Sequence, residues 1–254
     1  MTSATPNIRL YVEHDLGTDR EFLIDGNQGH YLINVMRMKE GEVVALFNGR
    51  DGEWMARLEK VGKGKALVRV LGHLEDQAEE PDLWYLFAPV KKARLDYMVE
   101  KATELGVSLI RPVMTRRTIV DRVKEERLRA NAIEAAEQCG RLTVPEIEEP
   151  VKLDKLLAGW PDDRLIMFCD EAGGEGAQDI KPVGEAVAQA GQSSGLTKWA
   201  ILIGPEGGFS PEERQMIRSH PQTVAVTLGP RILRADTAAV AAISLWQSFA
   251  GDWQ

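Results

Sequence analysis

LIGPEGGFSPEE (Leu202–Glu213) is a glycine-rich stretch between an apolar run and the expected start of a helix, and it is the main indication of the fold class. The apolar run that leads into it predicts a buried strand ending at Gly204. Ser210 can cap a helix, Pro211 suits its first position, and Glu213 completes a capping box. The residues in between are therefore expected to form a strand-to-helix loop, at the ligand-binding edge of an α/β sheet.

The composition of this loop disfavours a phosphate ligand. A P-loop needs G-x-x-x-x-G-K-[ST], with a lysine for the phosphate charge, and neither this motif nor the dinucleotide fingerprint G-x-G-x-x-G is present. The loop carries Glu206 instead, whose carboxylate would repel a phosphate. Exposed backbone suits the edge of a flat heterocycle, and a carboxylate suits hydroxyls, an amine or a sulfonium. A neutral or cationic ligand is expected, unless the loop merely joins two elements.

A second glycine–proline loop follows the next apolar run. TLGPRILRADTAAVAAISLW (Thr227–Trp246) opens with Leu-Gly-Pro at a strand end and leads into a long apolar helix. Arg231 and Arg234 stand between the two, and Asp236 or Thr237 is expected to cap the helix. The two loops, one acidic and one with two arginines, are expected to form two walls of one pocket. The alternative is that the arginines are solvated charges at a helix entrance.

The elements around these loops predict a parallel sheet. Short apolar strands are expected at Leu83–Pro89, Val107–Val113, Leu165–Cys169, Lys198–Gly204 and Thr223–Gly229, with helices at Ala93–Leu105 and Lys124–Cys139. Strands that alternate with helices are typical of an α/β fold with helices on both faces of the sheet.

The first 75 residues predict a different architecture. Strands are expected at Val43–Gly49, Gly52–Val61 and Lys65–Gly72, with one helix near His30–Met38 and glycine-rich turns. This pattern is typical of a small antiparallel barrel. Residues 76–82 are polar and acidic, and we expect them to link a barrel domain of residues 1–75 to an α/β domain of residues 83–254.

Composition and charge limit the class of protein. No run of about 18 apolar residues is present, and the start MTSATPNIRLYVEHD lacks the apolar core of a signal peptide, so a cytoplasmic protein without a membrane partner is expected. Cys139 and Cys169 are expected to be buried free thiols, and the spacing of cysteine and histidine predicts no metal. The net charge of −8 disfavours nucleic acid, but residues 91–141 hold 12 basic and 8 acidic residues. A locally basic segment thus lies within an acidic protein.

Four motifs in order resemble one family of enzymes over nearly the whole chain. They are HYLINVMRMKEGE (His30–Glu42), KATELGV (Lys101–Val107), EQCGR followed by VPEI (Glu137–Ile147), and the paired loops GPEGG and LGPRILRADTAA. Together they are similar to those of the SPOUT methyltransferases, and within that superfamily to the RsmE family of 16S ribosomal RNA (uracil N3)-methyltransferases. Asp236 and Tyr31 depart mildly from the family, which is expected to have a glutamate and a histidine there.

The resemblance implies a fold, a cofactor and a target. It implies a SPOUT α/β domain with a carboxyl-terminal trefoil knot, a PUA-like barrel that helps to grip RNA, and a homodimer with its site near the subunit interface. S-adenosylmethionine is the implied methyl donor. The implied target is N3 of the uridine at position 1498, in the decoding region of 16S ribosomal RNA on the assembled small subunit. The alternatives are a catalytically inactive RNA-binding or ribosome assembly factor, and a SPOUT methyltransferase that acts on a different RNA.

Candidate catalytic residues follow from what uracil requires. Its N3 holds a proton, so a nearby base and a cation facing O2 and O4 would help the nitrogen to react. Arg234 is the candidate cation, because arginine keeps its charge. Glu206 and Asp236 are candidates for the base or for holding the cofactor. Arg141 is expected either to reach the site or the RNA, or to be a surface arginine.

Binding residues are expected in three places. Cofactor contacts are expected from the two loops, mainly through backbone, at Leu202, Gly204, Pro205, Glu206, Gly207, Gly208, Leu228, Gly229, Ile232, Leu233 and Thr237. RNA contacts are expected at Arg9, Arg37, Asn48 and Arg50 on the barrel, and at Arg116 and Arg117 in the basic segment. Each of these RNA-binding candidates, taken singly, could instead be a solvated surface residue.

Overall fold

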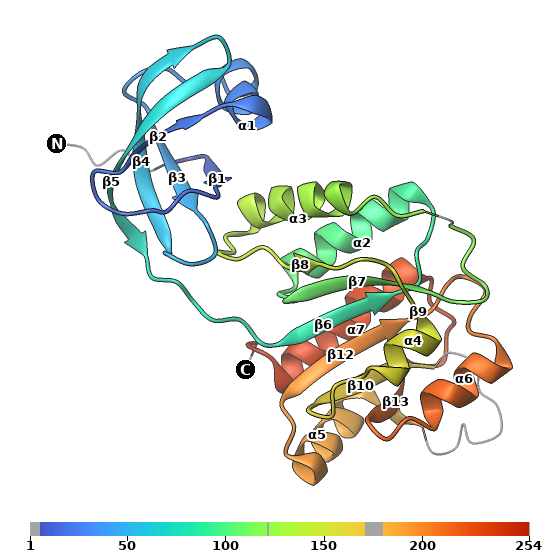
Figure 1. Cartoon of the computed structure of the whole chain (residues 1–254). Coiled ribbons are helices and arrows are strands. Elements are labelled where there is room, and N and C mark those ends of the chain that lie inside the picture. Colours follow the sequence, from blue (N-terminus) through green and yellow to red (C-terminus); the bar gives the residue numbers. More distant parts are fainter. Residues whose placement is uncertain (1–5, 121, 171–179, 254) are drawn as a thin grey trace. The chain divides into compact units, whose positions relative to one another are not determined.

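The computed structural model describes residues 6–120, 122–170 and 180–253, and Figure 1 shows their helices and strands. The chain divides into two compact units. The first comprises Met1–Glu79 together with Ala136–Val144, and the second comprises Glu80–Ala135 and Pro145–Gln254. A short segment from the middle of the chain therefore belongs to the amino-terminal unit, which no pattern in the sequence predicted.

The first unit is built on a five-stranded sheet in the order β1-β3-β4-β5-β2. β1 runs parallel to β3, and the other neighbouring strands are antiparallel. The three strands predicted between residues 43 and 72 are confirmed, whereas two short ones were missed. The strands are β1 (Arg9–Tyr11), β2 (Glu21–Ile24), β3 (Val43–Phe47), β4 (Glu53–Gly62) and β5 (Lys65–Glu75).

The predicted helix of the first unit forms earlier in the chain than expected. Instead of one helix over His30–Met38, the structure has α1 (Gly26–His30) continued by one π-helical turn, η1 (Tyr31–Val35). Arg37 then takes a φ of +56°, a left-handed conformation that ends a right-handed helix. The predicted carboxyl end of this helix is therefore wrong.

Arg9 on β1 ties the segment 136–144 into the first unit. Its guanidinium pairs with Glu53 at 2.5 Å. It also donates hydrogen bonds to the carbonyl oxygens of Ala136, at 2.8 Å, and of Arg141, at 3.0 Å. Hydrogen bonds from a charged donor are stronger than neutral ones. The side chain that was predicted to bind RNA is thus engaged within its own unit.

The second unit is built on an eight-stranded sheet in the order β11-β13-β10-β12-β6-β7-β8, with β9 beside β7. Every recorded pair in it is parallel, which confirms the α/β class. The trefoil knot stays a prediction. The strands are β6 (Leu83–Phe87), β7 (Leu109–Met114), β8 (Glu146–Ile147), β9 (Val151–Lys152), β10 (Arg164–Cys169), β11 (Lys181–Pro182), β12 (Lys198–Ile203) and β13 (Thr223–Thr227).

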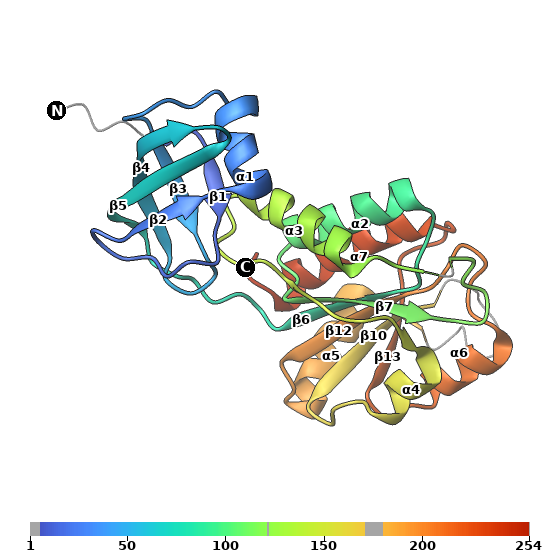
Figure 2. The same ribbon diagram turned by 45° about the horizontal axis from the view of Figure 1, so that its top comes forward.

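Helices cover both faces of this sheet, as the alternation of elements predicted (Figure 2). α4 (Leu153–Ala158) and α6 (Pro211–Arg218) pack on one face, in a cluster with buried side chains of β6, β10 and β12. On the other face, α7 (Ala235–Ala250) packs against α2 (Lys92–Glu104) and α5 (Val183–Ser194). The helix between β7 and β8 in the chain is α3 (Glu125–Cys139). No helix in the described ranges is long and apolar enough to cross a membrane.

The starts of the two site-proximal helices differ in how they are capped. The predicted capping box of α6 is confirmed, since Ser210 Oγ accepts from the Glu213 amide and the Glu213 carboxylate accepts from the Ser210 amide. The predicted cap of α7 by Asp236 or Thr237 is wrong, because the helix begins earlier and Arg234 is its N-cap residue. Ala235, a good helix former, is buried. Asp236 therefore falls in the first turn, where the positive end of the helix dipole stabilises its negative charge.

Candidate functional site

Four neighbouring strands of the second unit bring their following segments to one edge of the sheet. β13, β10, β12 and β6 lie side by side and run parallel, so their carboxyl ends share that edge. Asp170 follows β10, Gly204 follows β12 and Leu228 follows β13. Ligands of parallel α/β sheets bind at this edge, and here it is hollowed.

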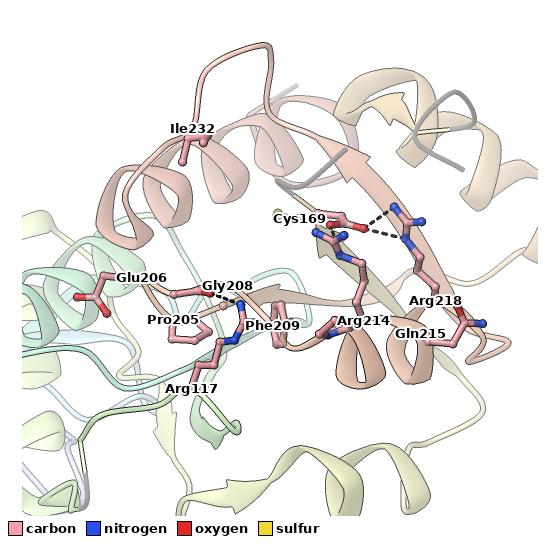
Figure 3. Close-up of a pocket in the computed structure, with 14 residues that line it drawn as sticks. Arg117, Cys169, Pro205, Glu206, Gly208, Phe209, Arg214, Gln215, Arg218 and Ile232 are labelled. Carbon is pink, nitrogen blue, oxygen red and sulfur yellow. Dashed lines mark hydrogen bonds and ion pairs between the residues drawn. The ribbon is translucent and has the colours of Figure 1, made fainter. Parts of the chain in front are cut away.

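A cavity of about 520 Å³ opens beside the loop that follows β12 (Figure 3). Its volume lies within the range of small-molecule sites, roughly 300–1,000 Å³. Six residues that were predicted to bind the cofactor line it: Gly204, Pro205, Glu206, Gly207 and Gly208 from the first loop, and Ile232 from the second.

Two glycines give the first loop its shape. The Gly208 amide donates to the Pro205 carbonyl at 2.8 Å, which closes a tight turn, and Gly208 takes a φ of +66°. A Cβ on Gly204 would come within 2.7 Å of the Phe209 ring. Gly208 is needed for its left-handed backbone and Gly204 for a close approach.

The second loop lines a smaller, adjoining cavity of about 60 Å³. Leu228, Gly229 and Leu233, all predicted cofactor residues, contribute to it. Cys169, Asp170 and Ile232 line both cavities. The two loops therefore border adjoining spaces that meet at these shared residues.

A buried ion-pair cluster between the cavities escaped the sequence analysis. The Asp170 side chain is only 2% exposed, and it pairs with Arg214 Nε at 3.1 Å and with Arg218 Nη2 at 2.6 Å (Figure 3). Both arginines come from α6 and line the larger cavity. Their i, i+4 spacing places them on one helix face, and this spacing was the available signal. These ion pairs hold α6 against the residue that follows β10.

An arginine that was not predicted joins the two candidates for the base. Arg94 of α2 lies 3.5 Å from a Glu206 oxygen, through Nη1, and 3.8 Å from an Asp236 oxygen, through Nε. All three side chains are partly exposed to solvent. The structure thus brings Glu206 and Asp236 together around one cation, although Glu206 lies in the loop after β12 and Asp236 in the first turn of α7.

Other predicted site residues lie outside the two cavities. Arg234 and Thr237 have exposed side chains at the start of α7. Leu202 is 1% exposed and packs in the core of the second unit. Arg141 belongs to the first unit, where its Nε donates to Thr143 Oγ1 at 2.8 Å.

The RNA-binding candidates of the first unit have unequal access to solvent. Arg37 is exposed, and Arg50 is half exposed in a pair with Asp15. Asn48 is only 3% exposed, because its amide donates to Asp51 and to a backbone carbonyl. The Leu16 amide and then the Asn48 side chain lower the pKa of Asp51 by hydrogen bonding to its carboxylate. Asn48 thus organises its own loop.

The two candidates of the basic segment lie beside the first loop. Arg117 donates to the Gly207 carbonyl at 2.7 Å and lines the larger cavity. Arg116 pairs with Glu212 at 2.8 Å in an exposed position, and its backbone amide donates to Glu213 at 2.7 Å. The segment after β7 is therefore held against the start of α6.

Glu213 is expected to stabilise this arrangement. Its buried carboxylate accepts from the backbone amides of Ser210 and Arg116. Glu213→Ala would leave both amides without this acceptor, and we expect a loss of about 2–3 kcal/mol in the free energy of unfolding. Urea titration measures the change. Glu212→Ala, at the exposed neighbouring position, is the control and should leave stability almost unchanged; equal losses in the two variants would contradict this role.

The two cysteines differ in their exposure to solvent. Cys169 is buried, but Cys139 is exposed at the end of α3, so the expectation that both thiols are buried is wrong. The reason is that Cys139 occupies the solvent-facing side of the last helical turn. Across the described ranges, no three His, Cys, Asp or Glu side chains are grouped so as to hold a metal ion.

Comparison with known proteins identifies relatives along the whole chain. A family model for the RNA methyltransferase domain matches residues 78–247, and one for the RNA methyltransferase PUA domain matches residues 24–71. The ribosomal RNA small subunit methyltransferase E of Rickettsia conorii is 32% identical over 237 residues, which is 93% of each chain. That of Bacillus subtilis is 31% identical over 231 residues, which is 88% of each chain.

A solved structure extends the likeness to three dimensions. The ribosomal RNA small subunit methyltransferase E from Neisseria gonorrhoeae, bound to S-adenosyl methionine, superposes with a TM-score of 0.82 at 30% identity. The match covers 97% of this chain and 99% of that one. Both units of the present chain therefore have counterparts in a single solved protein.

Proposed function

The chain belongs to the ribosomal RNA small subunit methyltransferase E family, and from this premise we propose that it methylates N3 of a uridine in 16S ribosomal RNA. The proposed target is position 1498 of the decoding region, on the assembled small subunit, and the proposed methyl donor is S-adenosylmethionine. The observation that carries the proposal is the acidic glycine loop after β12, which lines a cavity sized for a small molecule.

The residues around the cavity fit S-adenosylmethionine. Gly208 has no heavy atom within 4 Å of where a Cβ would stand, so backbone is left accessible to a ligand. The loop lacks a lysine and offers Glu206, which suits ribose hydroxyls or the sulfonium. Gly204, Gly208 and Ile232 would hold the donor. When bound, S-adenosylmethionine supplies a methyl group that its sulfonium already activates.

The remaining chemistry falls to side chains of the chain itself. Uracil N3 becomes a good nucleophile only when it loses its proton, and Glu206 or Asp236 is proposed to accept that proton. Arg234, as predicted from the sequence, is one candidate for the cation that faces the imide oxygens. We further propose a homodimer in the cytoplasm, in line with the motifs of the family.

RNA binding is expected to depend steeply on salt. The proposed phosphate contacts are Arg37 and Arg50 in the first unit, and Arg116 and Arg117 in the second. Each contact displaces counterions, so Arg37→Gln should reduce the slope of log K against log salt by about 1. Filter binding of small ribosomal subunits between low and moderate salt measures the slope. Arg57→Gln, whose partly buried side chain pairs with Glu59 on β4, is the control. A flat dependence for the unmodified protein would contradict this footprint.

One experiment tests the proposed reaction. Purified protein is incubated with isotope-labelled S-adenosylmethionine and small ribosomal subunits that lack the modification, and the RNA nucleosides are identified by mass spectrometry. Labelled 3-methyluridine at position 1498 is the expected product. Label in another nucleoside would overturn the target, and cofactor binding without any label would overturn the substrate. Absence of both label and cofactor binding would favour an RNA-binding assembly factor.

A further inference from the structure

A third cavity, of about 390 Å³, lies between the start of α2 and the segment after β7. We call it the Arg94 pocket. Its apolar wall includes Pro89, Ala93, Ile119 and Val120, and its polar side chains include Arg94 and Glu206. Its volume falls in the range of ligand sites, roughly 300–1,000 Å³. No motif in the sequence pointed to this pocket.

Glu206 connects the Arg94 pocket to the proposed donor cavity. It lines both of them, so the loop after β12 forms their common border. In Figure 3, the Glu206 side chain points away from Arg214 and Arg218, which lie across the donor cavity. A methyl acceptor has to lie next to the methyl donor, because reacting atoms must come within about 3–3.5 Å of each other. The Arg94 pocket adjoins the proposed donor cavity at Glu206.

The chemistry of the pocket matches a flat ring that carries an imide. Ile119 is 76% exposed, so the rim of the pocket has an apolar surface in contact with solvent. A flat ring could pack on this surface. Lys91 and Arg94 bring two positive charges to the lining, and Arg94 also lies beside the carboxylates of Glu206 and Asp236. Negative charge on the imide oxygens of a uracil would be stabilised by these two cations.

We propose that the Arg94 pocket receives the uracil ring to be methylated, with Arg94 facing an imide oxygen and stabilising the N3-deprotonated base. This inference rests on the proposed function. The ion pairs of Arg94 with Glu206 and Asp236 hold the guanidinium in place, and they put both candidate bases next to it. The N3 proton passes to one of these carboxylates. Arg234, by comparison, is exposed and lines none of the three cavities.

The first test separates charge stabilisation from a structural role. Arg94→Gln is expected to lower kcat about 100-fold, the usual effect of removing one group that stabilises a developing anion. Its affinity for S-adenosylmethionine, measured by calorimetry without RNA, should stay unchanged. The deficit should shrink as pH rises, because alkaline solution supplies deprotonated uracil without help from the arginine. Arg94→Lys, which keeps the positive charge, should retain more activity than Arg94→Gln.

The second test asks where the base lies. Ala93 is an exposed helix residue of the pocket, and Ala93→Trp would fill the space; Ala130→Trp, on an exposed face of α3, is the matched control. The first variant should lose methylation but keep cofactor affinity, and the control should keep both. Small subunits reconstituted with 4-thiouridine at the target position should cross-link to the peptide of residues 89–94 or to Ile119 and Val120.

The outcomes distinguish the inference from the function on which it rests. If the wild-type protein forms no 3-methyluridine, the proposed function fails. If it does form 3-methyluridine, the inference alone is overturned by any of three results. These are wild-type rates for Arg94→Gln and Ala93→Trp, loss of cofactor affinity in parallel with their activity, or a cross-link that maps outside the pocket.

Discussion

Asp170→Ala is expected to lower the free energy of unfolding by about 3–5 kcal/mol, the usual effect of removing one partner from a buried ion pair. The Asp170 side chain is almost fully buried, and Arg214 and Arg218 would lose the carboxylate that pairs with both of them. Asp170 also lines both proposed cofactor cavities. Affinity for S-adenosylmethionine should therefore fall together with stability. Urea titration and calorimetry measure the two effects.

Two further variants identify the cause of that loss. Asp163→Ala removes a carboxylate whose pair with Lys198 is exposed, and stability should barely change because solvent screens such pairs. The triple variant Asp170→Ala, Arg214→Met, Arg218→Met removes the two positive charges that pair with Asp170 and should regain part of the stability. If the triple variant is less stable than Asp170→Ala, the loss does not come from the charges of these arginines.

Gly208→Val is expected to reduce methyl transfer about 100-fold, which is the effect of misplacing a reactant by about 1 Å. Gly208 has a φ of +66° beside the donor cavity, where a β-branched side chain would both strain the backbone and enter the ligand space. The readouts are methylation of small subunits and affinity for S-adenosylmethionine.

Gly195→Val is a close control for that substitution. Gly195 ends α5 with a φ of +68°, its Cβ position is equally open, and it lines neither proposed cofactor cavity. Both variants should lose stability by about 1–2 kcal/mol, because both force a branched residue into the left-handed region. Only Gly208→Val should lose cofactor affinity. Equal effects on affinity would mean that backbone strain, and not the ligand space, is what the substitution changes.

The strands and helix starts that could be predicted from the sequence are those with a clear pattern over a few neighbouring residues. Apolar runs identified β6, β10 and β12, because a strand buried on both faces has few polar positions. The run TVAVT also identified β13, although most of its residues are only half-buried. The capping box at Ser210 identified the start of α6. The strands β1 and β2 were missed, since three or four residues carry too short an alternation to stand out.

The parts of the site that were missed depend on long-range contacts. Arg94 sits within a helix whose apolar face gives no sign that it would meet Glu206 and Asp236, more than a hundred residues away. In the sequence, Asp170 is only an acidic residue after a strand. It becomes a buried counter-ion because α6 packs against it and brings Arg214 and Arg218 close. Conversely, Arg9 has the positive charge that suits a phosphate contact, but its guanidinium already donates hydrogen bonds to backbone carbonyl groups of its own unit.

The membership of Ala136–Val144 in the first unit has a consequence for how the protein is made. A nascent chain that has emerged only as far as Glu79 lacks the backbone acceptors of Arg9, as well as Leu142, which packs with Phe47. The part of the second unit from Glu80 to Ala135 must therefore be translated before the first unit can reach its final packing. The two units are interleaved along the chain, and a gene fragment cut after Glu79 would encode a five-stranded sheet in which Phe47 lacks its packing partners Ala136 and Leu142.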